Sequence, residues 1–419
     1  MDNIVVGIDV GTTKICTLVA RVEADDRLRI MGVGVEPSEG IRKGVIVDLT
    51  AASQSIARSV AQAEQSSGLK IDSALVSLAG AHVSSVNSRG VVAVTGHNVD
   101  DMDVERAMDA ARSVAIPSSR EIIHVIQRGF TLDGEDGIHQ PIGMHGYRLE
   151  VEAHVITAAL ATVENIRQAV AAAGVETVQF VLNPLASAEV VLSESERSMG
   201  AVVCDIGGGT TDMAIYVNGD VWHTMVLAVG GNHITQDIAH GLRLSLPQAE
   251  EVKKAHGFAL QSEIGLEETF TIQPFGEMQP VKMNRRDLAH IIEARVAEMF
   301  ELTLQEIKRS GYDSLLPAGM VLTGGTSLLP GIRQLATKVL GMPVRTAQPE
   351  KLLGLADKLN SPAYSTSVGL LTWAAALQAL PLSDYSLKGR GGLSRGTRGQ
   401  KGNGQNWNTL TNLLKRLLP

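Results

Sequence analysis

Residues 205–212 read Asp-Ile-Gly-Gly-Gly-Thr-Thr-Asp, and the fold is predicted outward from this stretch. The flanking segments 201–206 and 213–217 are apolar and β-branched, which predicts two antiparallel strands joined by a glycine-rich hairpin. Consecutive glycines permit positive φ and let backbone N–H groups approach a bound anion. Asp205, at the end of a buried strand, is placed to hold a magnesium ion through water. The alternative is an ordinary hairpin turn, because short glycine motifs also occur without a ligand.

The same layout occurs near the N-terminus. Residues 4–14 read as an apolar strand that ends at Asp9 and continues into Gly-Thr-Thr-Lys, and residues 15–22 read as the return strand. A third loop, Thr-Gly-Gly-Thr-Ser at 323–327, follows an apolar strand and precedes a helix. Two hairpins about 196 residues apart, with a Gly-Gly loop, predict two similar halves that face each other across a nucleotide.

Composition limits the classes of protein that this chain could represent. A length of 419 residues predicts two or three domains, and 44% apolar with 3% aromatic residues favours α/β layers built from aliphatic side chains. The net charge of −8 argues against a general nucleic-acid binder. Cys16 and Cys204 fit neither a disulfide framework nor a metal site. We recognise no signal peptide and no apolar run of ~18 residues, so we expect a cytosolic protein.

The order of predicted elements divides the chain into two halves with one interruption. In the first half we expect three strands, a helix, and a further strand, at 4–35, 48–66 and 71–79. The interruption at 83–163 predicts a β-α-β-β unit with elements at 86–95, 101–114, 121–132 and 148–158 and a polar loop at 133–145. In its last strand, alternation predicts a buried face at Leu149, Val151, Ala153 and Val155 and an opposite face at Glu150, Glu152 and His154.

The remaining elements complete the first half and build the second. We expect helices at 162–173, 185–192, 245–255, 284–310 and 365–380, and strands at 178–182 and 319–322, with mixed short strands in 258–282. Pro184 suits a first helical turn, and Gly230-Gly231-Asn232 is expected to open a helix. The helix at 365–380 is expected to pack back on the first half.

These motifs together resemble the actin-like ATPases, which share two phosphate hairpins, a Gly-Gly adenosine loop and two connecting helices in this order. Within that superfamily, the sequence resembles the FtsA family of bacterial cell-division proteins. The match is carried by residues 8–14, 205–212, 321–331 and 364–373, and it covers 4–380 and the C-terminal segment. The resemblance implies an α/β fold of the actin/Hsp70 type, with two similar lobes around a nucleotide cleft.

The resemblance also implies a division into domains. The first lobe would comprise 1–82, 164–199 and 365–381, with an inserted SHS2-like interaction domain at 83–163. The second lobe would comprise 200–230 and 309–364, with a subdomain at 231–308. A flexible basic linker and an amphipathic helix would follow, at 382–406 and 407–419.

Site residues follow from the same resemblance, with ATP and Mg²⁺ as the implied ligands. Asp9 and Asp205 would hold Mg²⁺ through water, and Glu250 and Lys253 would meet the ribose, although a surface ion pair between them is the plain alternative. The phosphate and adenosine contacts would come from Gly11, Thr12, Thr13, Lys14, Gly207, Gly208, Gly209, Thr210, Thr211, Gly324, Gly325 and Thr326.

One residue departs from the pattern of hydrolysing relatives. Those proteins place Gln or Glu at the start of the first connecting helix, where it orients the attacking water, whereas this sequence has Asn183. Asn is one methylene shorter than Gln and cannot act as a base. We therefore expect at most slow ATPase activity, with ATP acting chiefly as a ligand that closes the cleft.

The C-terminal segment predicts attachment to a membrane surface. Residues 382–419 carry seven Lys or Arg against one acid, which leaves the rest of the chain at −14. A helix over 407–418 would place its apolar side chains within an arc of about 140°. That arc holds Trp407, Leu410, Leu413, Leu414, Leu417 and Leu418, and Lys415 and Arg416 lie on the polar side. Such a helix is too short to span a bilayer but can lie in its interface on anionic lipid; docking on the protein itself is the alternative.

The resemblance further implies partners. The FtsA family binds the C-terminal peptide of FtsZ, a tubulin-like protein, through the subdomain at 231–308, and the basic candidates here are Arg285, Arg286 and Arg295. A solvated helix face is the plain alternative for each arginine. The inserted domain would meet later division proteins and neighbouring subunits of a filament. The implied location is the cytoplasmic face of the cell membrane at the division septum.

Other classes with this fold remain open at this stage. A sugar or acid kinase shares the loops but would need a second substrate pocket and would have no use for the terminal helix. Pilus-assembly relatives lack such a helix, and a heat-shock chaperone would need a long β-rich domain after residue 380. His233, Asp237 and His240 could suggest a metal, but no zinc-type ligand set completes the group.

Overall fold

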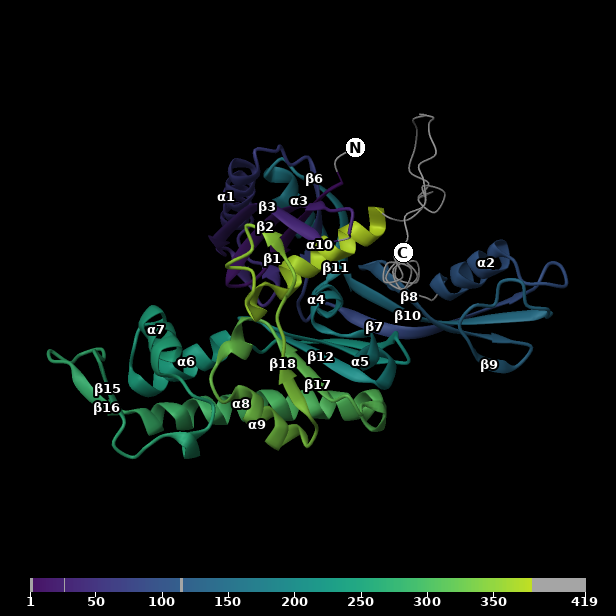
Figure 1. Ribbon diagram of the computed structural model, residues 1–419. Helices are drawn as coiled ribbons and strands as arrows, with labels where there is room; N and C mark the ends of the chain where they lie inside the picture. Colours follow the sequence, from purple (N-terminus) through teal and green to yellow (C-terminus); the bar gives the residue numbers. More distant parts are fainter. Residues whose placement is uncertain (1–2, 26, 114–115, 379–419) are drawn as a thin grey trace.

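The structure is a computed structural model that describes residues 3–25, 27–113 and 116–378. Two lobes, each built on a mixed β-sheet, lie one above the other in Figure 1, and a smaller domain extends sideways from between them. The predicted linker and the predicted terminal helix lie outside the described residues.

The first sheet contains the N-terminal hairpin that the sequence predicted. Its strand order is β11-β6-β1-β2-β3-β19, with β1, β2 and β3 antiparallel and β6 and β11 added parallel to β1. The strands are β1 (Ile4–Val10), β2 (Lys14–Val22), β3 (Leu28–Pro37), β6 (Ser73–Leu78), β11 (Glu176–Leu182) and β19 (Leu353–Gly354). Because β19 pairs with β3, the chain returns to the first sheet at residues 353–354, before residue 364, the predicted end of the second lobe.

The second sheet repeats the arrangement of the first. Its order is β14-β13-β12-β17-β18, again with three antiparallel strands on one side and two added parallel strands on the other. The strands are β12 (Ala201–Ile206), β13 (Thr211–Val217), β14 (Asp220–Leu227), β17 (Met320–Thr323) and β18 (Val344–Thr346). This repetition agrees with the two similar halves inferred from the paired motifs. Sequence reasoning missed β14, which follows a tight turn at Asn218 and Gly219, both with positive φ.

Helices cover both sheets, and each sheet buries a hydrophobic core beneath them. Helices α1 (Leu49–Ser67) and α3 (Leu160–Ala172) pack on the first sheet, and α8 (Arg285–Ser310) and α9 (Ile332–Leu340) pack on the second. The carboxylate of Asp48 caps α1 by accepting a hydrogen bond of 3.0 Å from the N–H of Ala51, which fixes the start of the helix.

Three helices connect the lobes. Helix α4 (Asn183–Val191) continues from β11, and the chain passes through α5 (Glu194–Met199) into β12 of the second sheet. Helix α10 (Ser365–Gln378) packs on α4 and β1, so it lies against the first lobe as predicted (Figure 1). A Cβ atom on Gly369 would stand 1.9 Å from the carbonyl oxygen of Ala186, so α4 and α10 meet backbone to backbone.

A subdomain extends from the second lobe, on the side of the molecule opposite to the inserted domain (Figure 1). It contains α6 (Gly231–Leu242), α7 (Leu246–His256), β15 (Thr269–Ile272) and β16 (Val281–Asn284). The short elements that remain are β4 (Ile41–Arg42), β5 (Val45–Ile46), η1 (Gln261–Glu263), η2 (Asp313–Leu315), η3 (Gly325–Leu328) and η4 (Pro362–Tyr364).

The inserted domain has the predicted β-α-β-β order with one additional strand. Its sheet has the order β7-β10-β8-β9 and carries one helix. The elements are β7 (Ser84–Ala93), α2 (Asp101–Arg112), β8 (Arg120–Leu132), β9 (Glu135–Ile138) and β10 (Arg148–Ala159). Strand β9 lies in the segment 133–145 that was expected to be only a polar loop.

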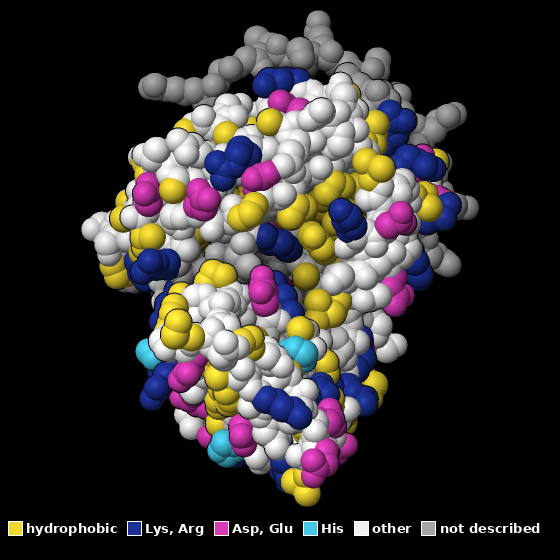
Figure 2. All heavy atoms as spheres, turned by 90° about the vertical axis from the view of Figure 1, so that its left-hand side faces the viewer, with side chains coloured by type: hydrophobic (Ala, Val, Ile, Leu, Met, Phe, Trp, Pro, Cys, Tyr) yellow, Lys and Arg dark blue, Asp and Glu magenta, His cyan; other side chains and the backbone are white. Residues whose placement is uncertain are grey.

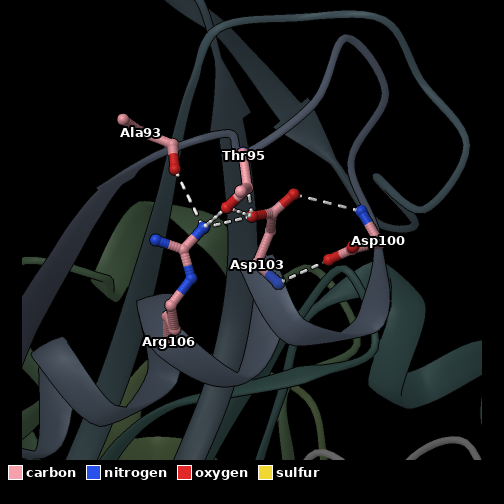
Figure 3. A network of polar contacts seen from close by, with 5 residues as sticks. All are labelled: Ala93, Thr95, Asp100, Asp103 and Arg106. Carbon is pink, nitrogen blue, oxygen red and sulfur yellow. Dashed lines mark hydrogen bonds and ion pairs between the residues drawn. The ribbon is translucent and has the colours of Figure 1, made fainter.

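A polar network around the buried carboxylate of Asp103 fixes α2 against the end of β7 (Figure 3). The carboxylate of Asp103 accepts hydrogen bonds from Thr95 and from the N–H of Asp100, and Asp100 in turn caps the helix. Arg106 donates to the carbonyl oxygen of Ala93 at 3.0 Å and to Thr95 at 2.6 Å, and it pairs with Asp103. Burial favours the neutral acid, but these hydrogen bonds outweigh it and lower the pKa of Asp103.

The second face of β10, which carries Glu150, Glu152 and His154, is buried at two of these three residues. Glu150 is 4% exposed and lies between Arg89 and Arg148, whose side chains cover its carboxylate. His154 is 1% exposed, and its Nδ1 and Nε2 atoms lie 2.7 Å from Asn87 and 2.9 Å from Thr224 of β14. Only Glu152 faces solvent. The second lobe covers His154, whereas arginines of the inserted domain cover Glu150, and local alternation could not reveal either.

The burial of His154 predicts a pH dependence of stability. Burial, together with the positive charge of Arg128 and the neighbouring His223, lowers the pKa of His154 to about 3 from its ordinary value of 6.5. The neutral ring therefore stabilises the fold above pH 6.5, and this contribution is lost as pH falls below that value. Between pH 7 and pH 5 we expect a loss of about 2 kcal/mol in the free energy of unfolding.

Chemical denaturation at both pH values would measure this loss. His154→Gln keeps hydrogen-bonding atoms near Asn87 and Thr224 but does not titrate, so it should show a clearly smaller loss. Equal losses in the variant and the parent would contradict the assignment.

Candidate functional site

The two hairpin loops have matching backbone geometry. In the first loop the N–H of Gly11 donates to the carbonyl oxygen of Lys14 at 3.1 Å, and in the second the N–H of Gly207 donates to that of Thr210 at 2.9 Å. Each bond begins two residues after an aspartate, Asp9 or Asp205, that is the last residue but one of the leading strand. The motif recognised twice in the sequence is therefore one local structure used twice.

The loops face each other across the space between the lobes. A Cβ atom on Gly208 would stand 2.0 Å from Oγ1 of Thr13, and one on Gly209 would stand 2.6 Å from Oγ1 of Thr12. The N–H groups of Gly231 and Asn232, at the start of α6, donate to the carbonyl oxygens of Gly207 and Gly208 at 2.9 and 2.8 Å. A side chain at Gly208 or Gly209 would collide with these threonine hydroxyls, so the glycines let the two loops approach each other closely.

A cavity of about 450 Å³ lies between these loops, and it brings together every residue that the resemblance assigned to magnesium and nearly every one assigned to nucleotide. Asn183 also lines it, and of the assigned nucleotide residues only Thr211 does not, because its hydroxyl donates to the carbonyl oxygen of Val229. The surface is hollowed between the lobes when the molecule is viewed from the side of α1 and α7 (Figure 2).

The two strand-end aspartates are buried and held by hydroxyl groups. Asp9 accepts hydrogen bonds from Ser77 at 2.9 Å and from Ser367 at 2.7 Å. Asp205 accepts hydrogen bonds from Ser187 of α4 and, at 2.8 Å, from Thr366 of α10. Burial raises the pKa of Asp205, although both hydroxyl groups lower it in part.

Two further oxygen atoms in the cavity wall lack a protein partner. Asp212 accepts a hydrogen bond from Thr210 through Oδ2, but its buried Oδ1 has no partner among the described residues, and neither does Oδ1 of Asn183. Burial raises the pKa of Asp212 well above its ordinary value, and the nearby Asp205 and Asp9 raise it further. These atoms accept hydrogen bonds, so they suit water molecules on a hydrated cation better than phosphate oxygens.

The two residues assigned to the ribose, Glu250 and Lys253, form an ion pair beside the cavity. Lys253 and Glu250 form an ion pair of 2.6 Å on one face of α7, and both side chains also line the cavity. Lys253 donates to Oγ1 of Thr235 at 2.8 Å and to the carbonyl oxygen of Gly231 at 3.2 Å. Burial lowers the pKa of Lys253, partly offset by Glu250. The pair is therefore fixed by α6 rather than free on the surface.

The third glycine loop closes the cavity from the second lobe. Gly324 has a φ of +85°, and Oγ1 of Thr326 donates to the carbonyl oxygen of Gly207 at 2.9 Å, so this loop is tied to the second hairpin. Apolar side chains follow at Leu328 and Leu329, and they line the same cavity. The lining of the cavity thus combines glycine-rich backbone and hydroxyl groups with apolar side chains.

Comparison with known proteins identifies the family. The model for "Cell division protein FtsA" matches residues 202–369, and the model for "SHS2 domain inserted in FTSA" matches 80–157. A "Cell division protein FtsA" from Pseudomonas aeruginosa is 42% identical over 377 residues, which are 90% of each chain. That from Bacillus subtilis is 39% identical, over 89% of this chain and 84% of the relative. This chain belongs to the FtsA family.

The FtsA-family assignment confirms the resemblance seen in the sequence, and solved structures confirm the actin-like fold. A PilM–PilN type IV pilus biogenesis complex aligns with a TM-score of 0.62 at 17% identity, over 88% of this chain and 98% of that chain. MreB5 of Spiroplasma citri bound to ADP aligns with a TM-score of 0.52 at 15% identity, over 90% and 99%. At these identities the likeness concerns the fold alone.

The basic residues assigned to a peptide partner do not form one surface. Arg286 and Arg295 are nine residues apart on α8, so at about 100° per residue they lie on roughly opposite sides of the helix. Arg295 pairs with Asp237 of α6, with Nε and Nη2 at 2.5 and 2.9 Å from its two carboxylate oxygens, and also with Glu298. The ion pair raises the pKa of Arg295.

The described part of the chain contains neither a direct metal site nor a spanning helix. Among the described residues, no three His, Cys, Asp or Glu side chains are grouped so that they could hold a metal ion. The three residues His233, Asp237 and His240 therefore do not form such a group. A search of the same residues found no helix long and apolar enough to cross a bilayer.

Sequence reasoning missed the residues that support the assigned ones. Asp212 stood at the end of the quoted motif but received no role, and Ser187, Thr366 and Ser367 were not connected with the aspartates. The available signal was the presence of hydroxyl side chains in apolar, buried helices, where each must find a partner.

Neighbouring glycines in the third loop make a matched pair for testing the site. A Cβ atom on Gly324 would stand 2.4 Å from Oδ1 of Asp205, and its φ disfavours any side chain, whereas one on Gly325 would have 3.7 Å to its nearest neighbour. We expect Gly324→Ala to lose about 1–3 kcal/mol in the free energy of unfolding and Gly325→Ala to lose little. Thermal denaturation compares them, and equal effects would contradict this geometry.

Proposed function

We propose that this chain is an ATP-binding, self-associating cell-division protein that tethers the FtsZ ring to the cytoplasmic membrane and helps to recruit later division proteins. The observation that carries the nucleotide part is the pair of facing loops, each with an aspartate two residues before its first glycine. Membership of the FtsA family supports the cell-division part. The tether, the filament and the recruitment come from the resemblance and from the C-terminal sequence.

The cavity suits a nucleoside triphosphate with a hydrated divalent cation. Backbone N–H groups of the glycine loops, with Lys14 and the hydroxyls of Thr12 and Thr13, are the donors that phosphate oxygens need. Asp9 and Asp205 would hold Mg²⁺ through its water molecules, and the unpartnered oxygen of Asp212 gives those waters a further acceptor. Bound Mg²⁺ would neutralise phosphate charge during hydrolysis.

We expect slow hydrolysis because the group at the water-positioning site is weak. Asn183 opens α4 and lines the cavity, and its Oδ1 atom can accept a hydrogen bond from water. An amide cannot take a proton from that water, and the shorter Asn side chain reaches less far than Gln. ATP would then serve mainly to hold the lobes in the arrangement that favours self-association.

Phosphate release by the purified full-length chain with ATP and Mg²⁺ tests this expectation. The parent should turn over far more slowly than tens of times per second, and Asn183→Gln should be faster by about tenfold or more. Asn232→Gln, another cavity-lining asparagine, is the control and should not accelerate the reaction. Fast turnover in the parent would refute the role given to Asn183.

Membrane attachment is proposed from the amphipathic pattern of residues 407–418. Each leucine contributes at most about 1.5–3 kcal/mol when fully buried, and insertion into an interface is partial. Ordering the helix costs about 1–2 kcal/mol per residue, so one segment binds weakly and reversibly. A filament would present many segments together and raise their effective concentration at the membrane.

Co-sedimentation with vesicles that contain anionic lipid tests the membrane proposal, with and without ATP. The full chain should bind, and a chain ending at Asn406 should not. Leu413→Asp and Asn412→Asp make the same charge change on the predicted apolar and polar sides, so we expect the first to weaken binding strongly and the second slightly. A variant that cannot self-associate should bind more weakly than the parent, and equal binding would contradict the coupling to filament formation.

The FtsZ contact is proposed at α8, around Arg295. Its guanidinium is already bound by Asp237, so an acidic peptide would have to compete with that carboxylate. The side chains of the pair are 26% and 29% exposed, which leaves the guanidinium accessible to such a competitor. Arg286, on the other side of the helix, would belong to a separate part of the contact.

Fluorescence anisotropy with a labelled FtsZ C-terminal peptide tests the role of Arg295. Arg295→Glu should abolish binding, and Asp237→Asn should strengthen it because the competing carboxylate is lost. Arg309→Glu, at an 81% exposed side chain near the end of α8, is the control and should change little. Unchanged affinity in Arg295→Glu would exclude this residue from the contact.

A further inference from the structure

The inserted domain belongs to the first lobe by connection but touches more than that lobe. Its chain enters from β6 and leaves into α3, and Ser84 at its start pairs with Thr157 near its end. His124 of β8 nevertheless reaches the start of α4 and the helix α10, and strands β7, β8 and β10 contact β14 of the second lobe. Three such contacts define how the domain is held.

The first contact reaches the start of the first connecting helix. His124 of β8 is fully buried, and its Nε2 accepts a hydrogen bond of 3.2 Å from the N–H of Leu182. Leu182 immediately precedes Asn183, which lines the nucleotide cavity. The ring of His124 also lies 5.5 Å from that of Trp373 on α10, measured between centroids. The inserted domain therefore binds the residue that directly precedes a residue of the cavity wall.

The same helix α10 carries the hydroxyls that hold both buried aspartates. Thr366 donates to Asp205 and Ser367 donates to Asp9, and Trp373 lies about two helical turns further along. Trp373 is fully buried, so α10 cannot shift along its axis without displacing the ring against His124.

The second contact reaches the second lobe through Arg128 of β8. Its guanidinium lies 4.1 Å from the ring centroid of Trp222 on β14 and 5.9 Å from that of Tyr312, and those rings meet edge to face at 5.3 Å. Arg128 is 8% exposed, and no ion pair to it is found among the described residues. Its hydrogen bond to the Tyr312 hydroxyl is long, at 3.5 Å.

The third contact lies beside it and is polar. Nε2 of His154 lies 2.9 Å from Oγ1 of Thr224, and the hydroxyl of Ser85 donates to the carbonyl oxygen of Thr224 at 3.2 Å. Strands β7 and β10 of the inserted domain thus meet β14, the edge strand of the second sheet. The domain spans from the connecting helices to the outer edge of the second lobe.

We propose that the inserted domain couples the closure of the nucleotide cleft to its own orientation, with Arg128 as the positioning residue. This inference rests on the proposed binding of ATP in the cleft. The hydrogen bond and ring contact at His124 fix one end to the start of α4 and to α10. The guanidinium of Arg128 instead lies near two aromatic rings with a single long hydrogen bond to Tyr312, and such a contact can slide. Closing or opening the lobes then either moves Arg128 across Trp222 and Tyr312 or turns the whole domain.

The coupling predicts a reciprocal effect on nucleotide affinity. In this structure the phosphate loops are in close approach and the Arg128 contact is formed, so the contact favours the closed arrangement. Removing it should lower the population of that arrangement and weaken ATP binding. We expect the Kd for ATP of the full chain with Mg²⁺ to rise by about three- to tenfold in Arg128→Ala.

Controls separate this effect from a general loss of structure. Arg112→Ala removes an arginine of the same domain whose ion pair, with Asp109, stays within α2, and its Kd should match the parent. Arg128→Lys keeps a cation near the rings and should restore part of the affinity. Should Arg128→Ala fail to fold, Thr224→Val removes the hydroxyl that faces His154 and should weaken ATP binding in the same direction.

Energy transfer between two dyes reports the orientation directly. Met102→Cys in α2 and Lys338→Cys in α9 place labels on the inserted domain and the second lobe, and the natural Cys16 and Cys204 are buried and do not compete. ATP should change the transfer efficiency in the labelled parent and in Arg112→Ala, and it should change it by less than half as much in Arg128→Ala.

The outcomes distinguish this inference from the function on which it rests. If the parent binds ATP but transfer does not change, or if Arg128→Ala matches the parent in both Kd and transfer, the coupling is refuted. If the parent does not bind ATP at all, the proposed nucleotide function itself fails.

Discussion

The arrangement of the two lobes depends on two buried carboxylates. Asp9 and Asp205 end the central strands of different lobes, and each would be costly to bury without hydrogen bonds. Adjacent residues of α10 supply them, because Ser367 donates to Asp9 and Thr366 donates to Asp205. One helical turn therefore satisfies both lobes at once. The relative position of the two sheets, the close approach of α4 and α10, and the shape of the cavity all depend on this shared support.

The sequence predicted those helices and strands whose signals lie within a short segment of the chain. Both hairpins, the long helix α8 and the connecting helix α10 carry their signals within about ten to twenty residues, through periodicity, caps and glycines. The missed strand β14 was within reach, since Asn218-Gly219 is a strong hairpin signal between apolar segments. The burial of His154 on β10 could not be predicted from local sequence, because the residues that cover this side chain lie about 70 positions away in the chain.

The candidate site shows the same division. The glycines and aspartates of the two hairpin loops could be predicted to lie together at one cavity because their spacing is the motif itself. The hydroxyls of Ser187, Thr366 and Ser367 could not be, since hydroxyls in apolar helices have many possible partners until the fold brings one close. Arg295 illustrates the opposite case: a basic residue that appeared free in the sequence is bound by Asp237, a carboxylate from another helix. Charge alone did not indicate whether the guanidinium was available.

The pairing of Ser84 with Thr157 makes the inserted domain a cassette with neighbouring ends. A unit of this kind can be exchanged between relatives, or replaced during evolution, without lengthening the chain that crosses the first lobe. Yet His124, Arg128 and His154 point from the cassette onto both lobes. An exchanged inserted domain would therefore fit only a host whose strand β14 and helix α10 match its contact residues. Residues of the inserted domain and of β14 and α10 are far apart in sequence, yet a substitution on one side of a contact would favour a compensating substitution on the other. We therefore expect the two sides to covary among relatives.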